Sequence, residues 1–192
     1  MFKRFAITLC AAMMISSSAL AANIEDAVQF AINIANDNSH GYSQGMYPYQ
    51  GSRESPDYDC SSLIYHSLQH AGFNTIDNWH KNPEYMRRYG GNQYSGDADT
   101  IWSDLGEGWI KISWQDAKDN LKRGDILCIP QHHVAFYIGD GKTVEARGVN
   151  NPTGLGRYET GDQGGEIDFY SAHDRYWTEV YRYVKQRDVA SS

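Results

Sequence analysis

The stretch from Pro56 to Gly72 constrains the fold of this chain more than any other part of its sequence. Two turn-forming residues, Pro56 and Asp57, lead to Asp59, and apolar residues then recur with helical spacing at 60, 63, 64, 68 and 71. Gly72 follows, as glycine commonly does where a helix ends. The pattern predicts a helix with one buried face and Cys60 in its first turn. Backbone N–H groups at a helix N-terminus favour negative charge, so a thiol there is biased toward the nucleophilic thiolate.

The first 21 residues have the pattern of an export signal. Lys3 and Arg4 precede an apolar run from Phe5 to Met14, and an Ala-x-Ala cleavage pattern ends at Ala21. That run is too short to span a bilayer, and no later stretch is long enough. We therefore expect a signal peptide over residues 1–21 and one domain over 22–192. The mature protein is predicted to be secreted or periplasmic, monomeric and without membrane contact.

The charge of the chain excludes some classes of partner. The 192 residues include 17 basic and 24 acidic ones, a net charge of −7. Loss of Lys3 and Arg4 with the signal leaves 15 basic residues and a net charge of −9. An acidic surface argues against nucleic acid or an anionic membrane as the partner. The 14 tyrosines and five tryptophans suit a groove for peptide or sugar, although aromatic residues also fill cores.

Cys128 is the second cysteine that remains after processing. In an oxidising compartment, two cysteines often form a disulfide, which would remove Cys60 as a nucleophile. Cys128 lies in an apolar, strand-like stretch over 125–130, however, and free cysteine is among the most frequently buried residues. We expect Cys128 to be a core residue and Cys60 to be free.

The order of the predicted elements indicates an α+β fold. Helices are expected over 24–35, from 60 onward, over 83–89 and over 114–121, the last one capped by Ser113. Strands are expected over 126–129, 134–138, 143–146, 166–170 and 179–184, with a hairpin turn at 139–141 and a long loop over 147–165. Helices followed by a run of antiparallel strands are typical of the α+β class.

A cysteine nucleophile requires a base and a third group that orients the base. Of the seven histidines, His132 and His133 stand at the start of a predicted strand, and periodicity does not choose between them. Glu145 lies on the strand expected to pair with it, nearly opposite position 133 if the turn centres on Gly139. A carboxylate there would hold one nitrogen of the imidazole. The alternative is that Glu145 is a solvent-facing strand residue.

Three segments resemble the NlpC-type cell-wall cysteine peptidases, and especially the related bacteriophage peptidoglycan hydrolases. Residues 57–62 resemble the nucleophile motif of the family. Residues 122–126 resemble the sequence before its first core strand, and residues 133–139 resemble the strand that bears its catalytic histidine. The resemblance implies a papain-like α+β fold, in which the nucleophile helix packs on an antiparallel sheet. It also implies that Cys60, His133 and the residue twelve positions after His133, here Glu145, form the catalytic set. Many members carry histidine at that third position.

The family also has an upstream tyrosine whose hydroxyl helps to bind the oxyanion. Residues 39–45 are similar to that segment, which points to Tyr42. Tyr47 and Tyr49 remain alternatives, because the loop before Pro56 is longer than in close relatives. The segment from Gly161 to Ile167 resembles a loop of the phage-type members and receives no role from the sequence.

The resemblance implies hydrolysis of an amide bond in the stem peptide of peptidoglycan, with no cofactor or metal. The expected bond joins D-glutamate to a diamino acid, and the alternative is the bond between muramic acid and L-alanine. A zinc amidase that uses His132, His133 and Glu145 is a second reading, although adjacent residues of a strand point to opposite faces. A third reading is a non-catalytic wall-binding protein on the same fold.

Overall fold

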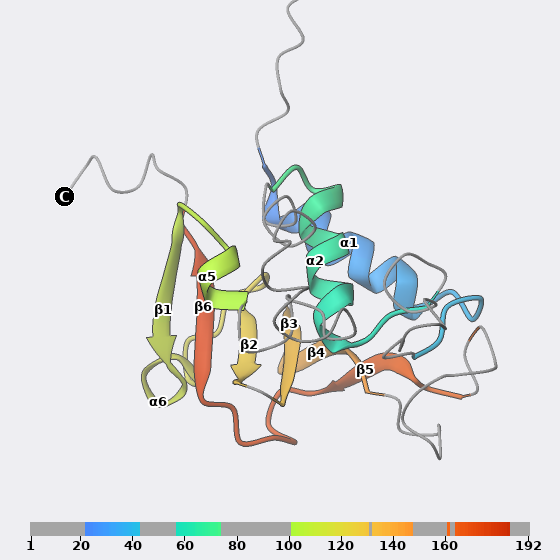
Figure 1. The fold of residues 1–192 in the computed structure, drawn as a ribbon. Coiled ribbons are helices and arrows are strands. Elements are labelled where there is room, and N and C mark those ends of the chain that lie inside the picture. Colours follow the sequence, from blue (N-terminus) through green and yellow to red (C-terminus); the bar gives the residue numbers. More distant parts are fainter. Residues whose placement is uncertain are drawn as a thin grey trace, which may run out of the picture.

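Figure 1 shows the protein in a computed structural model, which describes residues 22–42, 57–73, 101–130, 132–147, 161 and 164–184. The predicted signal, the predicted helix over 83–89, Tyr47, Tyr49 and most of the loop over 147–165 lie outside the described residues. The domain bounds therefore stay a prediction.

The described chain forms helices and a sheet in the predicted order. The helices are α1 (Ile24–Ala35), α2 (Cys60–His70), α5 (Ile101–Asp104) and α6 (Trp114–Ala117). The strands are β1 (Trp109–Ser113), β2 (Ile126–Ile129), β3 (His133–Gly139), β4 (Lys142–Ala146), β5 (Ile167–Ser171) and β6 (Glu179–Tyr183).

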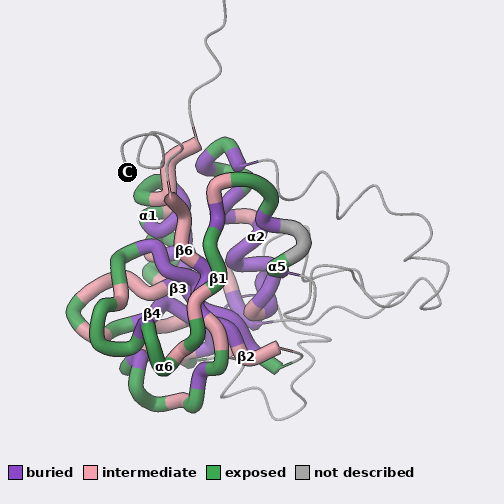
Figure 2. The backbone as a smooth tube through the Cα atoms, turned by 90° about the vertical axis from the view of Figure 1, so that its left-hand side faces the viewer, coloured by how far each residue is buried: buried purple, intermediate pink, exposed green. Residues whose placement is uncertain are grey.

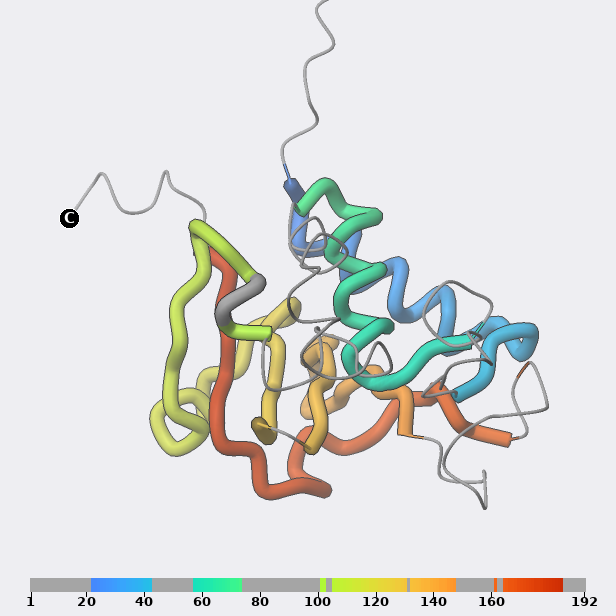
Figure 3. The backbone as a smooth tube through the Cα atoms, in the orientation of Figure 1, coloured from blue at the N-terminus to red at the C-terminus, as the bar shows by residue number. Residues whose placement is uncertain are grey.

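All six strands join one antiparallel sheet in the order β1-β6-β2-β3-β4-β5. Helices α1 and α2 pack against each other, and both pack on β3 and β4 (Figures 1 and 3). Figure 2 shows the buried residues concentrated along β2, β3 and β4, whereas α6 is largely exposed at the surface. The prediction of an α+β fold, in which the helix that begins at Cys60 packs on an antiparallel sheet, is confirmed.

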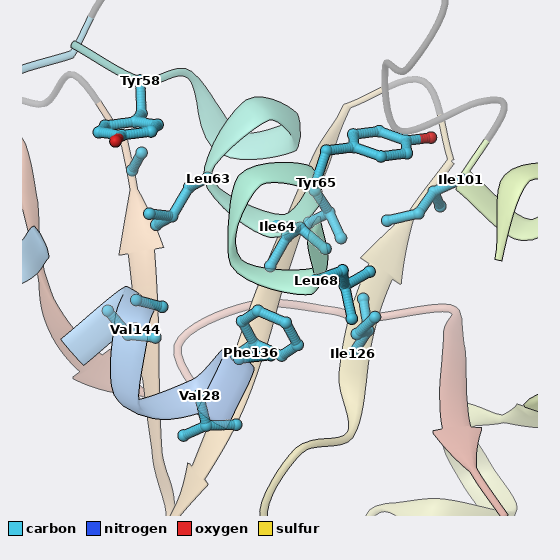
Figure 4. Packing of buried hydrophobic residues seen from close by; sticks show 14 of the residues in the cluster. Val28, Tyr58, Leu63, Ile64, Tyr65, Leu68, Ile101, Ile126, Phe136 and Val144 are labelled. Carbon is cyan, nitrogen blue, oxygen red and sulfur yellow. The ribbon is translucent and has the colours of Figure 1, made fainter. Parts of the chain in front are cut away.

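The main core lies between these helices and the sheet. Leu63, Ile64 and Leu68 of α2 are almost fully buried and meet Phe136 of β3 in this core (Figure 4). Their spacing places them on one side of α2, and burying each such side chain contributes about 1.5–3 kcal/mol. A smaller core on the opposite face includes Trp177 and the side chains of Leu127, Ala135, Ala172 and Val180.

The start of α2 is fixed by a reciprocal pair of hydrogen bonds. Asp59 Oδ1 accepts from the backbone N–H of Ser62 at 2.7 Å, and Ser62 Oγ accepts from the backbone N–H of Asp59 at 2.9 Å. This capping box satisfies two donors that a helix start leaves open. The cap makes Cys60 the first residue of the helix, within the first turn where the sequence places it.

Two parts of the secondary structure differ from the prediction. Helix α6 ends at Ala117 rather than at 121, because Asn120 donates to the Ala117 carbonyl in a turn that leads the chain into β2. Strand β1 and helix α5 were not predicted. Strand β1 is an edge strand in which only Trp109 is buried, so it lacks the alternating pattern of a half-buried strand.

No helix among the described residues has the length and apolar character needed to cross a membrane.

Candidate active site

Cys60 is half-buried and lies against the main core at the N-terminus of α2. Helix α2 packs on β3, the strand that begins at His133, and Figure 1 shows the first turn of α2 and the start of β3 toward the same end of the sheet. Cys128 is fully buried in β2, and the two thiols are not joined. Cys128 is thus a core residue, as predicted, while the pairing of Cys60 with His133 remains a prediction.

The structure brings His133 and Glu145 into direct contact. His133 Nε2 lies 2.7 Å from Glu145 Oε2, and both side chains are buried. The solvent-facing alternative for Glu145 is therefore wrong. Of the two adjacent histidines, His132 is exposed and His133 is the one that reaches the carboxylate.

The strand register that produces this contact differs from the expectation. Phe136 pairs with Val144, and continuing this register places Glu145 opposite Ala135 rather than opposite His133. The turn consists of Asp140 and Gly141, both at positive φ, so it centres later than Gly139. His133 and Glu145 are consequently diagonal neighbours on one face, a separation that long side chains bridge.

Glu145 is held by four hydrogen bonds. Its Oε2 accepts from His133 and from Arg147 Nε at 2.8 Å, and its Oε1 accepts from Arg147 Nη2 at 3.1 Å and from the Thr143 hydroxyl. Burial by itself would raise the pKa of Glu145, but the hydrogen bonds from His133 and Arg147 outweigh it and lower the pKa to about 2. Glu145 is therefore a carboxylate at neutral pH.

The charge of Glu145 determines which nitrogen of His133 carries the proton in the neutral ring. A carboxylate only accepts hydrogen bonds, so Nε2 must donate. Nδ1 is then the basic nitrogen of the neutral imidazole. Trp177 stacks on this ring at 5.9 Å between centroids and 24° between planes. Burial lowers the pKa of His133, and the hydrogen bond to Glu145 opposes that shift only in part.

Tyr42 is buried, and its backbone lies beside the residues that precede Cys60. It forms a parallel backbone bridge with Tyr58, and its N–H donates to Glu166 Oε2 at 3.1 Å. The adjacent Gly41 N–H and the Gly161 N–H both donate to the buried Asp57 carboxylate, at 2.8 and 3.0 Å.

Gly41 is required by this close packing. A Cβ at position 41 would lie 2.0 Å from the Gly161 carbonyl oxygen, and no real Cβ contact is that short. The loop resemblance over 161–167 therefore has a structural meaning, because Gly161 and Glu166 support the Tyr42 backbone.

Several residues around the site were not predicted from the sequence. They are Asp57, Arg147, Glu166, Arg175 and Trp177. Arg147 carried a usable signal, since it lies two residues after Glu145 and therefore on the same face of a strand. Asp57 and Glu166 lie in segments that resemble the family, but neither receives a role from the sequence. Arg175 and Trp177 come from the connection between β5 and β6, whose path depends on the tertiary fold.

In the part of the chain that the structure describes, no three histidine, cysteine or acidic side chains are grouped so that they could hold a metal ion. His132 and His133 are adjacent, but only His133 contacts Glu145.

The model of the NlpC/P60 family matches residues 44–186. The chain belongs to the NlpC/P60 family. The match covers helix α2, His133 and Glu145, and it confirms the family inferred from the sequence. NlpC/P60 proteins are peptidoglycan hydrolases of the cysteine peptidase type, so the prediction of an enzyme of this class is confirmed at the level of the family.

Solved structures similar to this NlpC/P60 chain include three from mycobacteria. A hypothetical invasion protein of Mycobacterium tuberculosis is 19% identical, with a TM-score of 0.45, over 84% of this chain and 64% of that one. The P60 domain of an antigen from Mycobacterium avium subspecies paratuberculosis is 17% identical, with a TM-score of 0.48, over 84% and 98% of the two chains. The peptidoglycan hydrolase RipB of Mycobacterium tuberculosis is 19% identical, with a TM-score of 0.45, over 86% and 68%. This NlpC/P60 chain thus spans about two thirds of the first and third proteins. Among curated proteins no match was found.

Proposed function

We propose that this protein hydrolyses the bond between D-glutamate and the diamino acid in the stem peptide of peptidoglycan, with Cys60 as the nucleophile. The single observation that carries the proposal is the contact of His133 Nε2 with the ionised Glu145, which leaves Nδ1 as the base. A nucleophile at a helix N-terminus, a base and an orienting carboxylate are the parts that thiol acyl transfer needs.

The proposed reaction has two stages. The Cys60 thiolate attacks the amide carbonyl, and His133 Nδ1–H then gives its proton to the leaving amine as the C–N bond breaks. The product of this stage is a thioester on Cys60. Water, deprotonated by His133 Nδ1, attacks the thioester, and the acid and the free thiol are released. Glu145 stabilises the imidazolium that forms in each stage.

The oxyanion of each tetrahedral intermediate is proposed to bind the backbone N–H of Cys60 and the Tyr42 hydroxyl. Support comes from the Tyr42–Tyr58 bridge, which ties Tyr42 to the residue two positions before Cys60. One such donor contributes roughly 10²–10³ in rate in other enzymes.

The central test is Cys60→Ala on purified cell wall, followed by the release of new amino groups. We expect no release from this variant while its circular dichroism is unchanged. Cys128→Ala is the matched control, because that thiol is buried in the core and should be dispensable for chemistry. Full activity of Cys60→Ala would refute the thiol mechanism.

The bond is identified by mass spectrometry of the products from one purified muropeptide. The proposal expects a peptide that ends in D-glutamate and a fragment that begins with the diamino acid. A free glycan and an intact stem peptide beginning with L-alanine would instead show the N-acetylmuramoyl-L-alanine amidase. Activity that is lost on chelation but survives a thiol alkylator would show a zinc enzyme. Sedimentation with cell wall but no hydrolysis would show a binding protein.

We also propose that the protein acts outside the cytoplasm, on the basis of the signal pattern over residues 1–21. The mass of the protein recovered from the periplasm or medium tests this, and a chain that still begins at Met1 would contradict it.

A further inference from the structure

A second arginine lies beside Glu145 without a hydrogen bond to it. Arg175 Nε is 3.4 Å from Glu145 Oε2, whereas Arg147 makes two hydrogen bonds to the same carboxylate. An ionised carboxylate has about four acceptor sites. His133, Thr143 and Arg147 already supply four hydrogen bonds, so the acceptor capacity of Glu145 is filled before Arg175 is counted.

The Arg175 guanidinium is therefore incompletely paired within the described part of the chain. Its Nε is buried and has no hydrogen-bond partner there, while 33% of the side chain is exposed. A buried charged donor that makes an ion pair but no hydrogen bond is incompletely satisfied, so its presence requires a reason. Two guanidinium groups, those of Arg147 and Arg175, thus lie beside the single buried carboxylate of Glu145.

Arg175 belongs to the connection between β5 and β6, which also covers the catalytic histidine. Trp177, two residues later, stacks on the His133 ring. Tyr176, between them, is 97% exposed. The connection thus places one aromatic ring on His133, one cation beside Glu145 and one tyrosine in solvent.

His133 also determines which half of the substrate lies near this connection. In the proposed reaction, His133 Nδ1–H protonates the leaving amine, so the leaving half of the substrate must reach the imidazole. Trp177 stacks on the imidazole and Arg175 lies beside its carboxylate, so both belong to the surroundings of the ring that this half must reach.

We propose that Arg175 is a specificity-determining residue that binds a carboxylate on the leaving-group side of the scissile bond. A guanidinium matches a carboxylate with two parallel hydrogen bonds, and a partly exposed arginine offers such donors to a ligand. The inference rests on the proposed function, because a leaving diamino acid carries a free carboxylate when it has a second carboxyl group or ends the stem peptide.

The rival explanation is that Arg175 only adds positive charge beside Glu145. Arg147 already supplies that charge through two hydrogen bonds, with a side chain that is only 11% exposed. A purely electrostatic role would change the rate on every substrate alike, whereas carboxylate recognition would change the ratio between substrates.

The test compares two synthetic stem peptides that end in the diamino acid, one with free carboxylates and one with those carboxylates amidated. For the wild-type protein we expect kcat/KM to be about 10- to 100-fold higher on the free acid, the range of a charge-assisted hydrogen bond. Arg175→Gln should remove most of this preference, mainly by raising KM on the free acid. Arg175→Lys should restore part of it.

Arg123→Gln is the matched control. Arg123 is also about one-third exposed and pairs with Glu25 of α1, and it binds the Ile138 carbonyl, near the opposite end of β3 from His133. The Arg123→Gln substitution removes one positive charge far from the site, and the variant should keep the full preference for the free acid.

Two results would overturn the inference. One is an active wild-type protein that cleaves both peptides equally well, and the other is an Arg175→Gln variant that slows on both by the same factor. Failure of the proposed function is a separate outcome, since Cys60→Ala would then remain active or the products would show another bond cleaved.

Discussion

Trp177 lies stacked on the imidazole of His133, with the ring centroids 5.9 Å apart, and its indole Nε1 donates to the Ala172 carbonyl at 2.8 Å. Because burial is the main cause that lowers the pKa of His133, Trp177→Ala should raise this pKa toward the ordinary value of 6.5. NMR titration of His133 in the Cys60→Ala background measures the change. Trp177→Phe, which retains a stacking ring, is the control and should leave the pKa close to that of wild type.

Glu145→Gln should lower kcat by roughly 10²–10⁴, with a small change in KM. An amide does not stabilise the imidazolium, and its NH₂ group can reverse the hydrogen bond that fixes the proton on Nε2. Steady-state kinetics on a stem peptide measures the effect. Asp168→Asn is the control. Asp168 is the partner of Glu145 on β5, so this substitution removes one negative charge next to the site, as Glu145→Gln does. Equal losses in the two variants would show a general charge effect.

The stability of the protein should fall between about pH 4.5 and pH 2. The folded-state pKa of Glu145 is about 2 and its ordinary value is 4.5. A depressed carboxyl pKa adds stability that is complete above the unfolded value and is lost as pH falls through the folded value. The contribution is roughly 3 kcal/mol at neutral pH. Urea unfolding at pH 7 and pH 3 tests this contribution. Between these two pH values, the free energy of unfolding should fall less for Glu145→Gln than for the wild-type protein. Parallel curves for the two proteins would contradict the prediction.

Arg147→Lys should destabilise the protein and slow the reaction. Arg147 makes two hydrogen bonds to Glu145, and its guanidinium lies 3.5 Å from the centroid of the Tyr170 ring. Lysine cannot make the forked contact, and disrupting a buried ion pair costs up to about 3–5 kcal/mol. The free energy of unfolding and kcat are the measurements. Tyr170→Phe keeps the ring and should retain most of the stability and most of kcat. A larger loss in Tyr170→Phe than in Arg147→Lys would assign the loss to the Tyr170 hydroxyl.

Glu166→Ala should impair the reaction through Tyr42. The Glu166 carboxylate accepts the hydrogen bond of the Tyr42 N–H, so its removal should displace the Tyr42 hydroxyl. Tyr42→Phe should lower kcat by roughly 10²–10³. If Glu166 acts by positioning Tyr42, the double variant Glu166→Ala/Tyr42→Phe should be little slower than Tyr42→Phe alone. Additive losses would show that the two residues act independently, and Glu166→Gln, which keeps an acceptor oxygen, should recover part of the rate.

The sequence predicted those elements whose signals are local. The capped helix at Cys60, helix α1 and the five strands from β2 to β6 each carry a cap, an apolar period or a turn signal within a few residues. Strand β1 and helix α5 were missed because their residues are held mainly by contacts with distant segments. Trp109, for example, is buried against Phe73, which lies 36 positions earlier in the chain.

By itself, the sequence determined the family and the α+β class and predicted Cys60 as the nucleophile, because helix starts, strand patterns and motif spacing depend on neighbouring residues. It also named His133 and Glu145, but not their contact at 2.7 Å, which a turn at Asp140 and Gly141 and a diagonal register produce. Only the tertiary structure decided the surroundings of that pair. Arg175 and Trp177 come from the β5–β6 connection and Glu166 from the loop before β5, and side chains from separate loops meet only after the sheet has formed.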